Sequence, residues 1–119
     1  MAKPGARPRP GLIDYYADVF APLGPVEVSR LFGGWSFRLD GRAFAFFVGD
    51  ALYYRVVGPA LRAEIEACGS RPFSYPKRGG RVMVTKFMSA PEDDLEDEDA
   101  LRGWALRVLA EPEPVRGSR

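Results

Sequence analysis

The segment 30–56, RLFGGWSFRLDGRAFAFFVGDALYYRV, contains the strongest structural signal in the chain. An Asp-Gly pair at residues 40–41 separates two aromatic segments, and a Gly-Asp pair at 49–50 precedes a segment that begins Leu-Tyr-Tyr. Asp-Gly between alternating apolar residues is typical of a two-residue hairpin turn, because both central positions of that turn need positive φ. The segment therefore predicts three consecutive antiparallel strands joined by two tight turns.

The first predicted hairpin has a definite register. In a two-residue loop at residues 40–41 the flanking residues pair one by one, and their side chains alternate between the two faces of the sheet. The expected cross-strand pairs are Leu39 with Arg42, Phe37 with Phe44 and Trp35 with Phe46. One face then receives six apolar side chains: Trp35, Phe37, Leu39, Phe44, Phe46 and Val48. We expect helices to cover this face, and any uncovered part to bind a partner.

The flanking sequence predicts three helices. Apolar residues recur at helical spacing over residues 12–23, and Gly-Pro at 24–25 ends that helix. Gly58-Pro59 suits the start of a second helix, which Gly69 ends. A third amphipathic helix is expected over residues 98–110, with acidic residues at its start and Arg107 near its end.

The remaining segments complete the predicted domain. Residues 26–31 should be extended, and Gly33-Gly34 marks a bulge or a close backbone approach. Residues 71–80, with two prolines, are expected to form a loop before a strand over 81–87. The predicted fold is α+β, with a mainly antiparallel sheet of about four to five strands packed against the three helices. We expect one domain over residues 11–110, and disordered tails at 1–10 and 111–119.

The composition argues against most catalytic chemistry. The chain has no His and only one Cys, which excludes Ser-His and Cys-His nucleophile pairs and zinc sites built on imidazole. Cys68 is expected to be a small buried residue at the end of the second helix. The acidic run between residues 92 and 99 lacks the spacing of a calcium loop. We therefore expect no catalytic residue, no cofactor and no metal.

Hydropathy and charge limit where the protein can be located and which partners it can have. No segment has the roughly 20 apolar residues that a membrane helix needs, and the N-terminus does not resemble a secretory signal. A cytoplasmic protein without a membrane partner is expected. Residues 1–91 contain 13 Lys and Arg against 7 Asp and Glu, whereas residues 92–119 contain 4 against 9. This asymmetry fits either a solvated acidic loop or two partner surfaces of opposite charge.

Two groups of residues are candidates for binding. The first is a candidate partner or ligand surface that combines glycine, aromatic and basic residues: Gly33, Gly34, Trp35, Tyr53, Tyr54 and Arg55. The second is a basic cluster beside aromatic residues, a candidate contact for phosphate or nucleic acid: Lys77, Arg78 and Arg81.

A series of landmarks gives the chain a resemblance to a known family. In order they are Leu31-Phe32-Gly33-Gly34, Asp40-Gly41 with Phe44-Ala45, Leu52-Tyr53, Gly69-Ser70 with Pro72-Phe73, Tyr75, Pro91 and Trp104. With these spacings the chain resembles the N-terminal domain of the TfoX family of bacterial competence regulators, from about residue 26 to residue 109. The resemblance implies a non-enzymatic cytoplasmic regulator of transcription and DNA uptake. Full-length members of the family also have a second, C-terminal domain.

Three hypotheses for the function follow. The first is a regulatory module that acts through a protein partner, with the transcription machinery as one candidate. The second is a small-molecule-binding domain whose pocket lies between sheet and helix, near Gly33-Gly34, and is lined by Trp35 and by Tyr53 or Tyr54. The third is weak nucleic-acid binding through the loop from Lys77 to Arg81.

Overall fold

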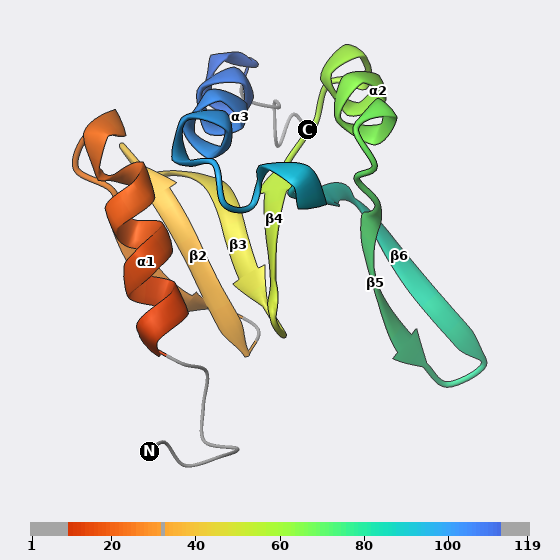
Figure 1. The fold of residues 1–119 in the computed structure, drawn as a ribbon. Helices are drawn as coiled ribbons and strands as arrows, with labels where there is room; N and C mark the ends of the chain where they lie inside the picture. The colour runs from red at the N-terminus through yellow and green to blue at the C-terminus, as the bar shows by residue number, and fades with distance from the viewer. Residues whose placement is uncertain (1–9, 32, 113–119) are drawn as a thin grey trace.

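The computed structural model describes residues 10–31 and 33–112 of the 119-residue chain (Figure 1). Its α-helices are α1 (Pro10–Phe20), α2 (Pro59–Ala67) and α3 (Glu98–Ala110). Its strands are β1 (Glu27–Leu31), β2 (Gly34–Leu39), β3 (Arg42–Val48), β4 (Ala51–Arg55), β5 (Pro72–Lys77) and β6 (Gly80–Ser89). Short 3₁₀ turns follow α1 at Ala21–Leu23 and precede α3 at Glu92–Asp94. Among the described residues, none of the helices has the length and apolar character that spanning a bilayer requires.

The strands form one antiparallel sheet in the order β1-β2-β3-β4-β6-β5. The α+β class with three helices is confirmed, but the sheet has six strands in the described chain rather than four to five. The additional strand is β5, in the segment that was expected to be a loop. Its two prolines are tolerated because β5 is the edge strand of this sheet, where a missing backbone N–H costs no ladder hydrogen bond.

The Asp40-Gly41 turn forms as predicted, with φ of 54° and 81° at its two residues, but the register beyond it differs. Leu39 pairs with Arg42 as expected, whereas Phe37 pairs with Ala45 and Trp35 pairs with Phe47. The ladder slips by one residue between Phe37 and Arg38, which leaves Phe44 without a partner in β2. A bulge of this kind lets two successive residues turn toward the same face.

The slip decides which aromatic side chains enter the core. Phe44 and Phe47 join Phe37 on the side of the helices, while Phe46 is turned to the other face. The predicted placement of Phe46 and Val48 on the core face was therefore wrong. Pairing by hairpin geometry alone could not include the bulge, which brings Phe44 and Phe47 into contact with Phe20 and Tyr16 of α1.

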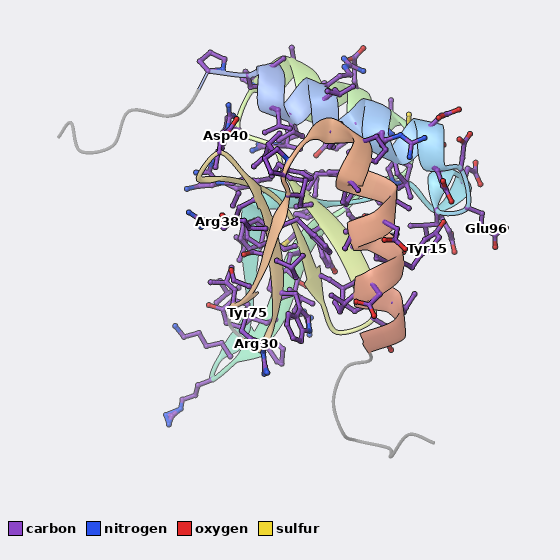
Figure 2. All side chains as sticks on the ribbon, turned by 90° about the vertical axis from the view of Figure 1, so that its left-hand side faces the viewer. Tyr15, Arg30, Arg38, Asp40, Tyr75 and Glu96 are labelled. Carbon is purple, nitrogen blue, oxygen red and sulfur yellow. The ribbon has the colours of Figure 1, made fainter. Side chains whose placement is uncertain are left out.

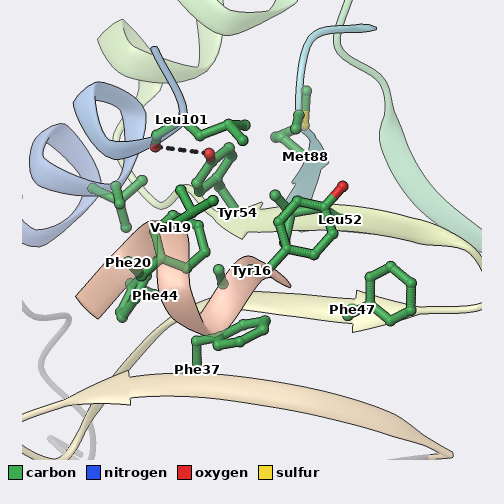
Figure 3. Close-up of a cluster of buried hydrophobic side chains, with 14 of the residues drawn as sticks. Tyr16, Val19, Phe20, Phe37, Phe44, Phe47, Leu52, Tyr54, Met88 and Leu101 are labelled. Carbon is green, nitrogen blue, oxygen red and sulfur yellow. Dashed lines mark hydrogen bonds between the residues drawn. The ribbon is translucent and has the colours of Figure 1, made fainter. Parts of the chain in front are cut away.

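The core lies between one face of the sheet and the three helices (Figure 3). The ring of Phe20 on α1 meets the rings of Phe37 and Phe44 edge-on, at centroid distances of 5.5 and 5.1 Å. Tyr54 of β4 is fully buried, and its hydroxyl donates a hydrogen bond of 2.9 Å to the carbonyl oxygen of Leu101 on α3. Buried side chains from all three helices and the sheet contribute: Ile13, Tyr16, Val19, Phe20, Phe37, Phe44, Ala45, Phe47, Leu52, Tyr54, Val56, Leu61, Ile65, Met88, Ala90, Leu101, Ala105 and Val108.

Two side chains tie the end of the described chain to the rest of the fold. The guanidinium of Arg42 donates to the carbonyl oxygens of Val108, Leu109 and Glu111, at 3.1, 3.1 and 2.7 Å. The carboxylate of Glu111 accepts from the backbone N–H groups of residues 57 and 58, just before α2, at 3.2 and 3.0 Å. Glu111, which was expected in a tail, thus holds two helix ends. Residues 1–9 and 113–119 of the expected tails lie outside the described residues.

Candidate functional site

The sheet face opposite the helices, called the open face below, carries a second aromatic cluster. The side chains of Phe37, Ala45, Tyr54 and Met88 form one cross-strand row toward the helices. The neighbouring row, Ser36, Phe46, Tyr53 and Ser89, therefore points the other way. All three helices of the described chain lie on one side of the sheet (Figure 1). No helix of the described chain thus covers the open face, although its inner residues Ser36 and Phe46 are buried, at 2% and 4% exposed.

Ring contacts join the central strands to the β5–β6 hairpin on this face. Phe46 of β3 stacks on Phe87 of β6 with a centroid distance of 4.2 Å. Tyr53 of β4 meets Phe73 of β5 edge-on at 5.2 Å, and Phe73 lies 6.0 Å from Tyr75. Aromatic pairs at these distances contribute about 0.5–1.5 kcal/mol beyond the area they bury. The open face is therefore ordered by its own side chains and does not depend on a helix.

An irregularity in β6 shapes this hairpin. Pro72 pairs with Met88, but the next residue, Phe73, pairs with Val84, so residues 85–87 have no partner in β5. Extra residues in one strand bend it and increase its twist. The hairpin leaves the body of the domain at this point and extends away from α2 and α3 (Figure 1). The bend lets the hairpin face the end of β3.

A concave pocket of about 480 Å³ lies between this hairpin and the end of β3. Its walls are aliphatic and aromatic: Val48, Phe73, Tyr75, Val84 and Phe87. Tyr75 is 41% exposed and lies at the mouth of the pocket, whereas Phe73 and Phe87 are half-buried. Pockets that bind small molecules or side chains are typically apolar hollows of this kind, with volumes of about 300–1,000 Å³.

The charged residues of the strands are mostly cations, whereas the acidic residues gather outside the strands. The six strands contain seven Lys and Arg but a single carboxylate, Glu27, on the far edge strand β1. The acidic residues cluster instead in the segment 92–99, which leads into α3. Figure 2 shows Arg38 and Tyr75 on the side of the sheet away from the helices, and Glu96 on the helix side. Strand alternation also places Arg55 and Lys77 on the open face.

The residues of the first predicted surface do not come together. Tyr53 and Arg55 lie on the open face, but Tyr54 is buried in the core, so its assignment to a surface was wrong. Trp35 lies on the helix side, where Arg30 stacks over its ring at 4.9 Å. Because Trp35 and Tyr53 occupy opposite faces and Tyr54 is fully buried in the core, these residues do not form the predicted pocket between sheet and helix.

The glycine pair has a structural role that fits the sequence interpretation. Gly33 is exposed and has a φ of 78°, which favours glycine. Gly34 is buried at the start of β2, and a Cβ there would collide with the carbonyl oxygen of Phe47. The pair therefore allows the close approach of β2 to β3 and does not line a binding site.

The basic cluster is split by the hairpin. Lys77, Arg78 and Arg81 are all exposed near the turn between β5 and β6. Lys77 lies two residues after Tyr75 in β5, so its side chain is on the open face with that of Tyr75. The guanidinium of Arg81 instead donates to Ser74 Oγ at 3.0 Å on the other face. The three cations therefore do not converge on one phosphate-sized site.

Cys68 and the acidic residues before α3 lie at the ends of helices. Cys68 is exposed at the end of α2, so its prediction as a buried residue was wrong. Asp97 caps α3 by accepting from the backbone N–H of residue 100 at 3.0 Å, and Asp94 accepts from Trp104 Nε1 at 2.9 Å. Within the described chain, no group of three or more Cys, Asp or Glu side chains is placed to hold a metal ion.

Burial disfavours the ionised form of three tyrosines. Burial raises the pKa of Tyr16 and of Tyr53, and it raises the pKa of Tyr54 well above the usual value of 10.0. A tyrosine whose pKa is raised keeps its proton at neutral pH. These hydroxyls therefore act as hydrogen-bond donors or as packed apolar surface.

Comparison with known families agrees with the fold and with the landmark residues. Residues 18–111 match the model of the TfoX N-terminal domain. The chain belongs to this family. The matched region of this TfoX N-terminal domain begins in α1 and ends at Glu111, the residue that anchors the start of α2. A search of curated proteins finds no match to the chain.

Most residues that line the pocket on the open face were not predicted from the sequence. The segment PFSYPK at residues 72–77 does alternate, with Phe73, Tyr75 and Lys77 on one side and Ser74 and Pro76 on the other. This period of two is a strand signal. The prolines concealed it, because their compatibility with a strand depends on β5 lying at the edge of the sheet.

Proposed function

We propose that this TfoX N-terminal domain is a non-enzymatic regulatory module that binds a protein partner through the open face. The observation that supports this most directly is the apolar pocket on a sheet face that no helix of the described chain covers. An exposed apolar hollow with charged neighbours is typical of an interaction surface. Membership in the family supports a role in cytoplasmic transcriptional regulation, with DNA uptake as the candidate process and the transcription machinery as the candidate partner.

A small-molecule ligand is the second candidate function. The pocket volume of about 480 Å³ and its apolar walls favour it. The ligand would lie on the open face and not between sheet and helix as first expected. Nucleic-acid binding has weaker support, because Lys77 and Arg81 point to opposite faces of the hairpin.

Site-specific photo-crosslinking in cells tests the proposal. A photoreactive phenylalanine analogue is placed at Tyr75, at the mouth of the pocket, or at Leu106, which is 54% exposed on α3. We expect a discrete protein adduct from position 75 and none from position 106. Equal adducts from both positions, or none from either, would contradict a protein partner at the open face.

A competing small ligand is separated from this result by mass spectrometry. The chain is purified from its cells and analysed under native and denaturing conditions. A stoichiometric small mass that is lost on denaturation would favour the second candidate, provided that Tyr75→Ser also abolishes it.

A further inference from the structure

We propose that the partner of the open face is an acidic protein segment that inserts one large apolar side chain into the pocket. This inference rests on the proposed function and names the chemistry of its partner. It combines the shape of the pocket with the charge of the strands around it.

The pocket suits an apolar side chain. Its five lining residues offer only one polar atom on a side chain, the Tyr75 hydroxyl, so a polar group inside would have to give up water with little replacement. Desolvated apolar hollows are where aromatic anchors of protein interfaces bind most strongly. Val48 comes from the end of β3 and the other four lining residues from the β5–β6 hairpin, so an anchor would contact apolar side chains from both parts of the sheet.

The basic side chains around the pocket favour a partner that carries carboxylates. Arg55 stands beside Phe87 in the β4–β6 ladder, and Lys77 follows Tyr75 on the same face of β5. Arg78 continues this basic edge at the exposed turn. None of these three forms an ion pair with another described residue in the structure. The strands contribute a single carboxylate, Glu27 on the far edge strand, and Asp50 lies in the turn two residues after the pocket residue Val48. A partner with acidic residues around its anchor would therefore meet its cations on the side of the pocket formed by β4, β6 and β5.

A nucleic-acid strand fits the same face less well. Stacking platforms need flat ring faces that are free, but Phe46 is stacked on Phe87, and Phe73 is met by Tyr53. Strands of nucleic acid are held by neutralising many phosphates, whereas the pocket is flanked by only Arg55, Lys77 and Arg78.

A second copy of the chain also fits poorly, although its acidic segment 92–99 has the required charge. The apolar residue of that segment, Leu95, is half-buried and packs against the core of its own domain. Asp94 and Asp97 already accept hydrogen bonds from Trp104 and from the start of α3. This segment therefore lacks a free anchor.

Defined peptides test the chemistry of the partner. The labelled chain is titrated by NMR with a short peptide that has one tryptophan flanked by aspartates. Two matched peptides replace the tryptophan by alanine or the aspartates by lysines. We expect saturable shifts at Tyr75, Phe73 and Val84 with the acidic tryptophan peptide, and binding at least about tenfold weaker with either control, which corresponds to about 1.4 kcal/mol.

Variants on the two faces of the hairpin provide the matched controls. Arg55→Glu and Lys77→Glu should each weaken the acidic peptide by about threefold to tenfold, the range expected for reversing an exposed charge pair. Arg81→Glu changes the charge by the same amount on the opposite face and should have a smaller effect. Tyr75→Ser should abolish the shifts, whereas Met83→Ser, at a residue 56% exposed on the opposite face, should not.

Three results would overturn the proposal: no binding of the acidic peptide, equal binding of all three peptides, or tighter binding of an oligothymidylate. Self-association that Tyr75→Ser removes, seen by sedimentation, would identify a second copy as the occupant and overturn it as well. The proposed function fails separately, because it depends on the crosslink at position 75. A protein adduct there, together with no response to the peptides, would retain the module and reject the acidic partner.

Discussion

Removing the hydroxyl of Tyr54 measures how strongly the sheet is joined to α3. Tyr54 is fully buried, and its hydroxyl donates a 2.9 Å hydrogen bond to the carbonyl oxygen of Leu101. Tyr54→Phe keeps the ring and deletes only this bond. A buried hydrogen bond contributes about 0.5–1.5 kcal/mol net, so we expect a loss of about 1 kcal/mol in the free energy of unfolding. For a domain of this size that corresponds to a fall of about 4–8 °C in Tm.

Truncating the whole ring should cost considerably more. Tyr54→Ala removes a large core side chain, and such changes cost about 3–5 kcal/mol, a large part of the stability of a small domain. Loss of partner binding in this variant would therefore report unfolding and not a lost contact. Tyr75→Phe is the matched control, because it deletes a hydroxyl at a side chain that is 41% exposed, and it should change stability by less than about 0.5 kcal/mol.

Urea denaturation followed by tryptophan fluorescence is the assay. We expect Tyr54→Phe to lower the midpoint without changing the slope of the transition, since the hydroxyl alters little buried area. An unchanged midpoint for Tyr54→Phe, or an equal decrease for Tyr75→Phe, would refute the conclusion that the hydroxyl of Tyr54 links β4 to α3.

Further predictions concern pH, the chain end and two glycines. The pKa of Tyr54 is raised in the folded state, so ionisation of this tyrosine in the unfolded chain favours unfolding. The free energy of unfolding should therefore fall above about pH 10. Urea midpoints measured across this pH range should fall less for Tyr54→Phe than for the wild type. Arg42→Met removes the guanidinium donor of three carbonyls near the end of α3, of which that of Val108 also accepts from the N–H of Glu111, and should cost about 2–3 kcal/mol in urea. Glu111→Ala should cost about 1–2 kcal/mol, as for loss of a helix cap, with faster hydrogen exchange in the first turn of α2. Gly34→Ala should destabilise the β2–β3 pair, because the new Cβ would collide with the carbonyl oxygen of Phe47. Gly103→Ala, in open space within α3, should raise Tm, because it should add about 0.5–1 kcal/mol to the free energy of unfolding.

The sequence predicted the elements whose signals are local. Asp40-Gly41 fixed the position of a turn, Gly58-Pro59 the start of α2, and the acidic run the start of α3 at Glu98. Each depends on the conformational preferences of a few neighbouring residues. The adjacent Tyr53 and Tyr54 point to opposite faces, as strand alternation requires.

What the sequence did not predict depends on neighbours distant in the chain. Which of the two tyrosines is buried depends on the face that the helices cover, and the bulge at Phe44 depends on the same packing. Pro72 and Pro76 concealed β5 because an edge position is a property of the assembled sheet. The candidate pocket needs both that edge strand and the bend of β6, so its walls could not be identified before the sheet was known.

The bonds of Arg42 and Glu111 have a consequence for synthesis of the protein on the ribosome. Arg42 binds carbonyls 66 to 69 residues later in the chain, and Glu111 returns to the start of α2. Contacts between such distant residues form slowly, because a long loop must close before they contribute. The nascent chain can form its first hairpins early, but it cannot complete the domain until the residues after α3 have left the exit tunnel. Until then the helix-facing aromatic side of the sheet has only part of its cover, and exposed apolar surface of this kind favours aggregation.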